Sequence, residues 1–238
     1  AATVCDVITS ANVVDVAVTS SALYWLESTG EVKTSLIDGT GAHTIVSNEA
    51  TPLAGIEANG QYVLWTAGGK LRRAAIDGSG ATSLLSLRGG CLRWQTPTTL
   101  LGSDPNAGNV LAIDPSNGGN TQVTVGASEP WGVAPKSAAG DFFYTNYSTS
   151  SGKIRLGDGD LTTTNATVLT NQAGPRCMAT DGTSVWWANR DSNTLVKATI
   201  GMQSVAAFVS NQPLVSGVAL DGTYVYWSSQ AGIRRRTK

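Results

Sequence analysis

The sequence of 238 residues predicts an all-β protein, a six-bladed β-propeller with four antiparallel strands in each blade. Three observations support this prediction. A β-rich run ending in an aromatic or large apolar residue recurs six times, roughly 40 residues apart. Asp-Gly and related turn pairs separate short runs rich in β-branched residues. The sequence lacks windows with the i, i+3, i+4, i+7 apolar spacing of a helix, so strands are expected throughout.

The second strand of each predicted blade ends at the residue that marks the repeat. The six markers are Trp25, Trp65, Leu101, Tyr144, Trp187 and Trp227. A period of about 40 residues, with four short strands in each unit, is typical of propeller blades. Because six units share one ring, residues 1–238 are expected to form a single domain.

The first strand of each blade is expected to lie innermost, where the blades crowd toward the axis. It opens with a mostly small residue followed by an apolar one. The first set is Asp15, Gly55, Cys91, Gly132, Cys177 and Gly217, and the second is Val16, Ile56, Leu92, Val133, Met178 and Val218. Side chains alternate between the two faces of a strand, so one face of this strand carries large aliphatic groups and the other carries small ones.

The third and fourth strands complete each blade. The third strand is expected to begin at Val32, Leu71, Val110, Ile154, Leu195 and Ile233. Nearly identical turns at 37–41 and 76–80 end it in the first two copies. The fourth strand then covers residues 43–47, 82–86, 121–125, 166–170 and 205–210 in copies one to five.

The two ends of the chain indicate how the ring closes. The sixth copy has no fourth strand, whereas residues 3–9 form a strand-like run that belongs to no copy of its own. An unpaired strand edge invites aggregation. We therefore predict that the N-terminal strand completes the last blade, a three-plus-one closure.

Composition excludes several classes of partner. The net charge is −1 and only 14% of residues are charged, so we expect no nucleic-acid binding. Apolar runs of the length that a membrane span needs are missing from the sequence. A surface rich in Gly, Ser, Thr and Asn favours a secreted or periplasmic protein whose signal peptide has been cleaved ahead of Ala1. A monomer is expected.

Three cysteines cannot all pair within one chain. Cys91 and Cys177 fall on inner strands of the third and fifth blades, with the fourth blade between them, and Cys5 falls on an outer strand of the sixth. A disulfide requires Cα atoms within about 7 Å. We therefore expect three free and largely buried thiols.

At its aromatic pairs the chain resembles a known family. Tyr24-Trp25, Tyr226-Trp227 and the runs 181–187 and 221–227 are similar to the repeats of YWTD-like six-bladed propellers. The greatest similarity is to bacterial, especially myxobacterial, repeat proteins of this type. The resemblance rests on residues that build blades, so it implies a fold rather than an activity.

The sequence offers no evident catalytic or metal-binding constellation. His43 is the single histidine and lies in a predicted outer strand. Zinc and iron sites usually need several converging His or Cys ligands, and a Ser-His-Asp triad needs its histidine in a cleft. We therefore predict no catalytic residues, metal or cofactor, which also argues against the metal-dependent lactonases and lyases built on six-bladed propellers.

One charged pair is expected beside the axis. Glu57 and Arg93 occupy equivalent positions on adjacent blades, so an ion pair across the channel wall is favoured. Contact with a ligand at the ring mouth is the alternative for both side chains.

The loop face, formed by the loops joining fourth to first strands and second to third strands, holds the other candidate binding residues. These are Trp131, Arg176, Asn146, Tyr147, Asn189 and Arg190. Trp131 and Arg176 precede the first strands of adjacent blades, and an aromatic ring beside a guanidinium suits a sugar, a peptide or a carboxylate. Trp131 could equally cap the core.

These observations favour a non-catalytic binding or scaffolding propeller that recognises a glycan or a protein through its loop face. A hydrolase or lyase with a weakly marked axial site, such as Asp15, Glu57 and Arg93, is one alternative. A structural propeller that assembles with itself or with another domain is the other.

Overall fold

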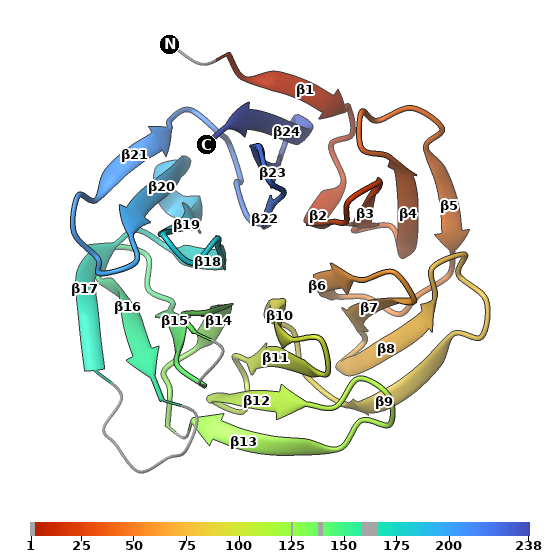
Figure 1. The fold of residues 1–238 in the computed structure, drawn as a ribbon, viewed down its shortest axis with the longest axis horizontal. Helices are drawn as coiled ribbons and strands as arrows, with labels where there is room; N and C mark the ends of the chain where they lie inside the picture. Colours follow the sequence, from red (N-terminus) through yellow and green to blue (C-terminus); the bar gives the residue numbers. More distant parts are fainter. Residues whose placement is uncertain (1–2, 125, 138–139, 159–165) are drawn as a thin grey trace.

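A ring of six four-stranded antiparallel sheets surrounds a central axis in the computed structural model (Figure 1). The structure describes residues 3–124, 126–137, 140–158 and 166–238. In each sheet the strands follow one another outward from the axis, and the chain passes from blade to blade around the ring. The prediction of a six-bladed β-propeller is confirmed.

The strands agree closely with the predicted repeat. The first three blades contain β2 (Val13–Val18), β3 (Ala22–Glu27), β4 (Glu31–Leu36) and β5 (His43–Val46); β6 (Leu53–Ala58), β7 (Tyr62–Ala67), β8 (Lys70–Ala75) and β9 (Thr82–Ser86); and β10 (Leu92–Thr96), β11 (Thr99–Asp104), β12 (Asn109–Ile113) and β13 (Asn120–Thr124). The fourth and fifth contain β14 (Pro130–Pro135), β15 (Phe142–Asn146), β16 (Gly152–Gly157) and β17 (Ala166–Gln172); and β18 (Pro175–Thr180), β19 (Ser184–Asn189), β20 (Thr194–Thr199) and β21 (Ala206–Val209). Among the described residues the helical content is one 3-10 turn, η1 (Arg190–Ser192).

The sixth blade joins the two ends of the chain, as predicted. It consists of β22 (Val218–Leu220), β23 (Tyr224–Ser229), β24 (Gly232–Thr237) and, as its outermost strand, β1 (Cys5–Ile8). Strand β1 runs antiparallel to β24, with Cys5 opposite Arg235 and Ile8 opposite Ile233. Asp6 and Arg234 add an ion pair of 2.7 Å across this join. Figure 1 shows the red first strand lying beside the dark-blue last one.

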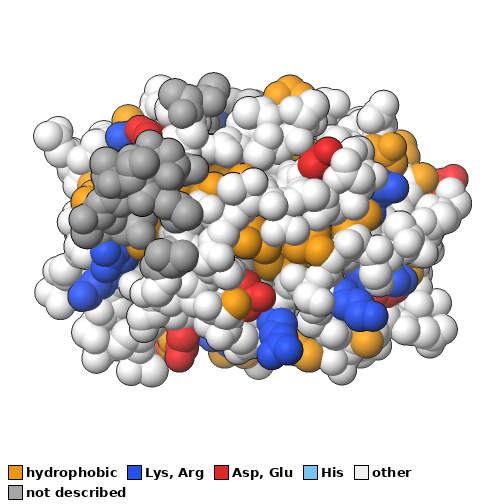
Figure 2. Space-filling model, turned by 90° about the horizontal axis from the view of Figure 1, so that it is seen from below, with side chains coloured by type: hydrophobic (Ala, Val, Ile, Leu, Met, Phe, Trp, Pro, Cys, Tyr) orange, Lys and Arg blue, Asp and Glu red, His pale blue; other side chains and the backbone are white. Residues whose placement is uncertain are grey.

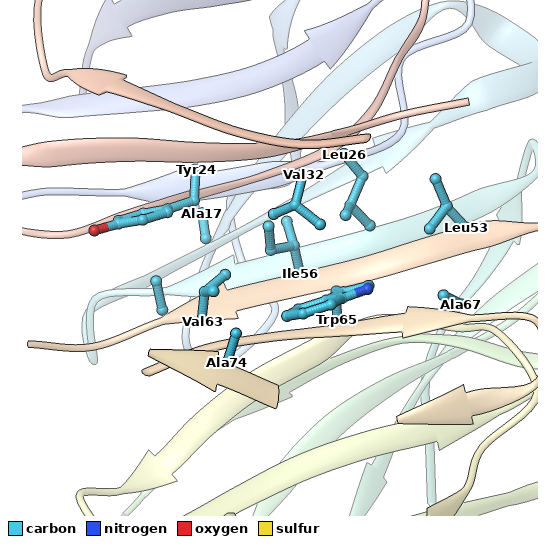
Figure 3. Close-up of a cluster of buried hydrophobic side chains, with 11 residues drawn as sticks. Ala17, Tyr24, Leu26, Val32, Leu53, Ile56, Val63, Trp65, Ala67 and Ala74 are labelled. Atoms are coloured by element: carbon cyan, nitrogen blue, oxygen red, sulfur yellow. The ribbon is translucent and has the colours of Figure 1, made fainter. Parts of the chain in front are cut away.

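The apolar core is divided into clusters that lie between and within neighbouring blades. Figure 3 shows the cluster between the first two blades, where Leu26 and Val32 face Ile56 and Trp65. These side chains are fully buried, because side chains alternate along each strand and one face of every sheet packs against the next blade. The marker tryptophans are among the largest buried side chains in the chain.

Each buried marker tryptophan has a hydrogen-bond acceptor for its indole N–H. Trp25 donates to Glu27 at 3.2 Å, and Trp65 donates to Glu49 at 3.0 Å. Two further pairs repeat the arrangement, Trp187 with Gln172 at 3.0 Å and Trp227 with Gln212 at 2.9 Å. An indole N–H left unpaired in the core would cost free energy. The carboxylates of Glu27 and Glu49, on the loop face, therefore serve as hydrogen-bond acceptors for buried tryptophans.

At the axis, glycine lets adjacent inner strands approach closely. A Cβ atom on Gly132 would lie 2.1 Å from the carbonyl oxygen of Arg176, and one on Gly55 would lie 2.5 Å from that of Gly90. A hydroxyl group of the second strand also binds the main chain at this position: Thr66 Oγ1 accepts a hydrogen bond from the N–H of Gly55 at 2.9 Å. The small residues predicted at these positions are thus required by packing.

The prediction of three free thiols is wrong. Cys91 and Cys177 form a disulfide, with Cα atoms 5.6 Å apart, whereas Cys5 is free but exposed. The expectation treated the fourth blade as a spacer. Near the axis it is not one, because Gly132 has no side chain and the inner strands of the third, fourth and fifth blades converge there. The N–H of Cys91 even donates directly to the carbonyl of Trp131 on the fourth blade, at 2.8 Å.

Few residues of the chain are charged. On the side of the ring shown in Figure 2, Lys, Arg, Asp and Glu side chains form small groups on a mostly uncharged background. Within the described ranges, no helix combines the length and the apolar character that crossing a membrane requires.

Candidate functional site

A cavity of about 390 Å³ opens at the ring mouth on the loop face, where the inner strands begin. We call it the mouth cavity. Its polar and aromatic lining comes from several blades, and Cys91 and Cys177 form part of its floor. The main lining residues are Pro52, Leu53, Arg88, Pro105, Asn106, Trp131, Arg176 and Arg190.

The mouth cavity brings together three of the predicted binding residues, Trp131, Arg176 and Arg190. The guanidinium carbon of Arg176 lies 3.8 Å from the centre of the Trp131 ring and 4.6 Å from that of Tyr147. Cation–π contacts of this kind fix a long side chain in one position. Trp131 is half-buried and open to the cavity, so it does not serve merely as a cap over the core.

The cavity is electropositive. Its charged lining residues, within the described part of the chain, are Arg88, Arg176 and Arg190. Burial lowers the pKa of Arg176, and the nearby charge of Arg190 lowers it further, opposed in part by Tyr147 and Asp191. A bound anion would relieve both effects, because it would offset the desolvation and the repulsion between the two arginines.

Asn146 and Tyr147 face a neighbouring open groove of about 460 Å³, which we call the side groove. Glu129 and Lys153 also line it. Tyr147 connects the two spaces, because its ring contacts Arg176 and its hydroxyl donates to Asp191 at 3.2 Å.

Asn189 lies inside the fold and does not line the mouth cavity. Its side chain is buried, and its amide donates to Gln172 at 2.9 Å, the same oxygen that accepts from Trp187. Asn189 therefore helps to join the fifth blade to the end of β17 in the fourth.

Glu57 and Arg93 form the predicted ion pair, at 3.1 Å, deeper in the channel. Arg93 also donates to the main-chain carbonyl of Met178 at 2.8 Å and to that of Val218. The pair lines a small cavity of about 160 Å³ at the opposite mouth, so it is separate from the mouth cavity. Arg93 thus crosses the channel and links four blades.

Two carboxyl groups beside the axis have raised pKa values. Burial raises the pKa of Asp15 to about 6, against the opposing attraction of Arg93 and the N–H groups of Ile56 and Val16. Burial likewise raises the pKa of Glu57 to about 7; Arg93 lowers it and the charge of Asp15 adds to the rise. Desolvation is the dominant cause in both.

The remaining sequence candidates lie outside this region. His43 is exposed on the outer strand β5, as expected, with its Nδ1 2.8 Å from the carbonyl oxygen of Gly41. Sequence reasoning missed Arg88. It lies in the loop before β10, three residues ahead of Cys91, whereas Trp131 and Arg176 lie on β14 and β18, one residue ahead of Gly132 and Cys177, so aligning the repeats does not single it out.

Comparison with known proteins supports the fold. No protein-family model matches the chain, and no curated protein matches its sequence. A crystal structure of a nidogen/laminin complex is similar, with 14% sequence identity and a TM-score of 0.74 over 88% of this chain and 85% of that chain. A luciferin-regenerating enzyme gives 10% identity and a TM-score of 0.80 over 100% of this chain and 96% of that one.

A third similar structure is that of a catalytically inactive histidine-to-alanine variant of virginiamycin B lyase from Staphylococcus aureus with quinupristin. It has 16% identity and a TM-score of 0.68 over 96% of this chain and 81% of that chain. The chain shares the six-bladed fold of these proteins. The fold that the YWTD-like resemblance implied is confirmed, and at these identities the likeness extends to the fold alone.

Proposed function

We propose that this protein is a non-catalytic binding propeller that holds an anionic group of a glycan or protein ligand in the mouth cavity. The observation that carries the proposal is the stacking of Arg176 on Trp131, beside Arg88 and Arg190, in a cavity with Asn106 and several apolar side chains in its lining. Arginine suits carboxylates and sulfates because its planar fork donates two parallel hydrogen bonds.

The shape of the site fits a ligand of modest size. A volume of about 390 Å³ is typical of small-molecule sites and accommodates one or two sugar rings or a short peptide end. The exposed face of Trp131 and the apolar Pro52, Leu53 and Pro105 offer surface to the uncharged body of the ligand. A longer glycan or a protein loop would continue into the side groove, over Tyr147.

An enzyme is the second candidate, because Glu57 has a pKa suited to acid–base chemistry near neutral pH. The surroundings of Glu57 argue against it. Its carboxylate is paired with Arg93, whose guanidinium is held by main-chain carbonyls, and the adjoining cavity measures only about 160 Å³. The similar lyase is inactive as a histidine-to-alanine variant, whereas the single histidine here, His43, is exposed on an outer strand.

We further propose that the protein works as a secreted or periplasmic monomer of the bacterial, myxobacterial kind of repeat protein. The Cys91–Cys177 disulfide supports an oxidising compartment. Strand β1 covers the edge of β24, so this edge is paired without a second copy of the chain. Light scattering after size exclusion at several concentrations tests the monomer, and mass growth with concentration would favour the self-assembling alternative.

The binding proposal is tested on an array of acidic and neutral glycans together with a pull-down under oxidising conditions. We expect retention of uronate- or sulfate-bearing ligands, or of an acidic protein, and loss of at least tenfold in affinity for Trp131→Ala and Arg176→Ala. Trp94→Ala at the opposite mouth is the matched control and should bind normally. Failure of every acidic ligand, or equal binding by all three variants, would refute the proposal.

A further inference from the structure

Three side chains from alternate blades meet on the axis, directly beneath the mouth cavity. At one equivalent position of the repeat, near the start of each inner strand, the second, fourth and sixth blades have glycine, whereas the first, third and fifth have Asp15, Cys91 and Cys177. The carboxylate oxygen and the two sulfur atoms all lie within 4.8 Å of one another, and all three residues are buried. The glycines leave room for this convergence, since a Cβ on Gly217 would lie 2.1 Å from Asp15 Oδ1.

The fold provides incomplete compensation for the buried Asp15 carboxylate. Its oxygens accept two main-chain hydrogen bonds, from Val16 at 2.8 Å and from Ile56 at 3.1 Å. The salt bridges found among the described residues do not include it, because Arg93 pairs with Glu57. A carboxylate accepts about four hydrogen bonds, so lone pairs remain available on the side that faces the sulfur atoms. An asparagine would accept fewer and carry no charge.

We propose that reduction of the Cys91–Cys177 disulfide creates a binding site for a thiophilic divalent metal, zinc or a close relative, with Cys91, Cys177 and Asp15 as its ligands. Two thiolates and a carboxylate are ligands that zinc accepts, and three protein ligands leave a fourth position free. That position faces the mouth cavity, because both cysteines form its floor. The site does not depend on the binding function proposed above.

Geometry and charge both permit this site. Tetrahedral zinc with Zn–S distances of about 2.3 Å needs sulfur atoms roughly 3.8 Å apart. Cysteines with Cα atoms 5.6 Å apart reach this separation by rotation about their side-chain bonds once the disulfide opens. Two thiolates, a carboxylate and Zn²⁺ sum to one negative charge. Arg93 on one side and the arginines of the mouth cavity on the other stabilise that charge.

An external phosphine or dithiol is the reductant of the disulfide. With a phosphine, the sulfur–sulfur bond breaks, the phosphorus is oxidised to the phosphine oxide by oxygen from water, and the two hydrogens of water become the protons of two thiols. Metal binding then releases both thiol protons to solvent, because cysteine coordinates as the thiolate. Reoxidation would expel the metal, so binding is switched by redox state.

Cobalt(II) titration of the full chain, followed by visible absorption, tests the proposal. A Cys5→Ser background removes the one exposed free thiol. After reduction with a phosphine, we expect one Co²⁺ to bind per chain, with thiolate charge-transfer and tetrahedral d–d bands that Zn²⁺ abolishes. The oxidised protein should show neither band. Asp15→Asn should weaken binding at least tenfold, and Cys91→Ser with Cys177→Ser should abolish it.

A second measurement guards against loss of structure on reduction. Circular dichroism and thermal unfolding are recorded with and without Zn²⁺, and we expect the metal to raise the melting temperature of the reduced chain but not that of the oxidised one. Absence of thiolate–cobalt bands in the reduced chain would overturn the proposal. So would bands of equal strength in Asp15→Asn, since an unfolded chain binding through its thiols alone would not distinguish that variant.

Discussion

Arg93 of the third blade and Glu57 of the second form an ion pair of 3.1 Å inside the channel, where neither side chain is well hydrated. The same guanidinium donates to the carbonyls of Met178 and Val218 on the fifth and sixth blades. One side chain therefore joins the inner strands of four blades, two of which, in the third and fifth blades, are also linked by the Cys91–Cys177 disulfide. Contacts between adjacent blades hold most of a propeller together. The contact of Arg93 across the axis also fixes the positions of blades that are not adjacent.

Replacing Arg93 should destabilise the whole ring. Arg93→Leu leaves Glu57 without its partner and leaves several buried carbonyls without donors, which costs about 3–5 kcal/mol of unfolding free energy by analogy with other broken buried pairs. Denaturant unfolding followed by tryptophan fluorescence measures the loss. Lys136→Met is the control, because the 3.6 Å pair of Lys136 with Asp141 is exposed and should contribute about 1 kcal/mol or less. Equal effects of the two variants would show that the axial contact is unimportant.

Stability should fall as the pH rises through neutrality, because of Glu57. Its pKa is raised from 4.5 to about 7 in the folded chain, so the folded state binds the proton more tightly than the unfolded state does. The resulting stabilisation is complete below about pH 4.5 and is lost as the pH passes 7, a change of about 1–3 kcal/mol. The charged groups facing Glu57 are Arg93 and Asp15.

Unfolding free energies measured between pH 5 and pH 8, in about half-unit steps, give the slope directly. In Glu57→Gln the slope should be smaller, since glutamine does not titrate. The comparison uses slopes and not absolute stabilities, because the variant also loses the charge that Arg93 pairs with. A slope unchanged by the substitution would mean that Glu57 is already ionised throughout this range.

Loss of the disulfide should lower stability without abolishing the ring. Cys91 and Cys177 are 86 residues apart in sequence, and closing so long a loop restricts the unfolded chain considerably. For Cys91→Ala with Cys177→Ala we expect a loss of about 2–5 kcal/mol. Cys5→Ser serves as control, because Cys5 is exposed and free, and its effect should stay within about 0.5 kcal/mol. Far-UV circular dichroism should remain that of the parent protein.

The fold could be predicted from the sequence because each blade repeats the same local chemistry. The markers Trp25 and Trp227 stand at opposite ends of the chain in equivalent strands, and both are fully buried with a paired indole N–H. The alternation of Gly with Asp15, Cys91 and Cys177 was also visible in the sequence. Its meaning was not, because strand patterns give the order of blades but not how closely their inner ends approach.

The candidate site was only partly predictable for the same reason. Trp131 and Arg176 occupy equivalent positions, one residue ahead of Gly132 and Cys177 in adjacent blades, so their contact follows from blade order. Glu57 and Arg93 form the ion pair expected across the channel wall, but its depth was not predicted, because it lies at the opposite end of the channel from the mouth cavity. How deep a side chain lies in the channel depends on where its inner strand starts relative to the other five, and a single sequence does not determine that start. The burial of Asn189 was not predictable, because its partner, Gln172, belongs to the end of another blade.

The join between β1 and β24 should be essential for solubility. Deleting residues 1–10 removes β1, exposes the edge of β24 and uncovers the apolar cluster to which Val7 and Ile8 contribute. We expect aggregation, or unfolding that is no longer cooperative, when the truncated chain is heated and followed by circular dichroism and light scattering. Deleting residues 1–3 is the matched control, because it leaves β1, the packing of Val4 and the Asp6–Arg234 pair intact. If the longer deletion melted like the shorter one, the sixth blade would be stable with three strands and β1 would not be what closes the ring.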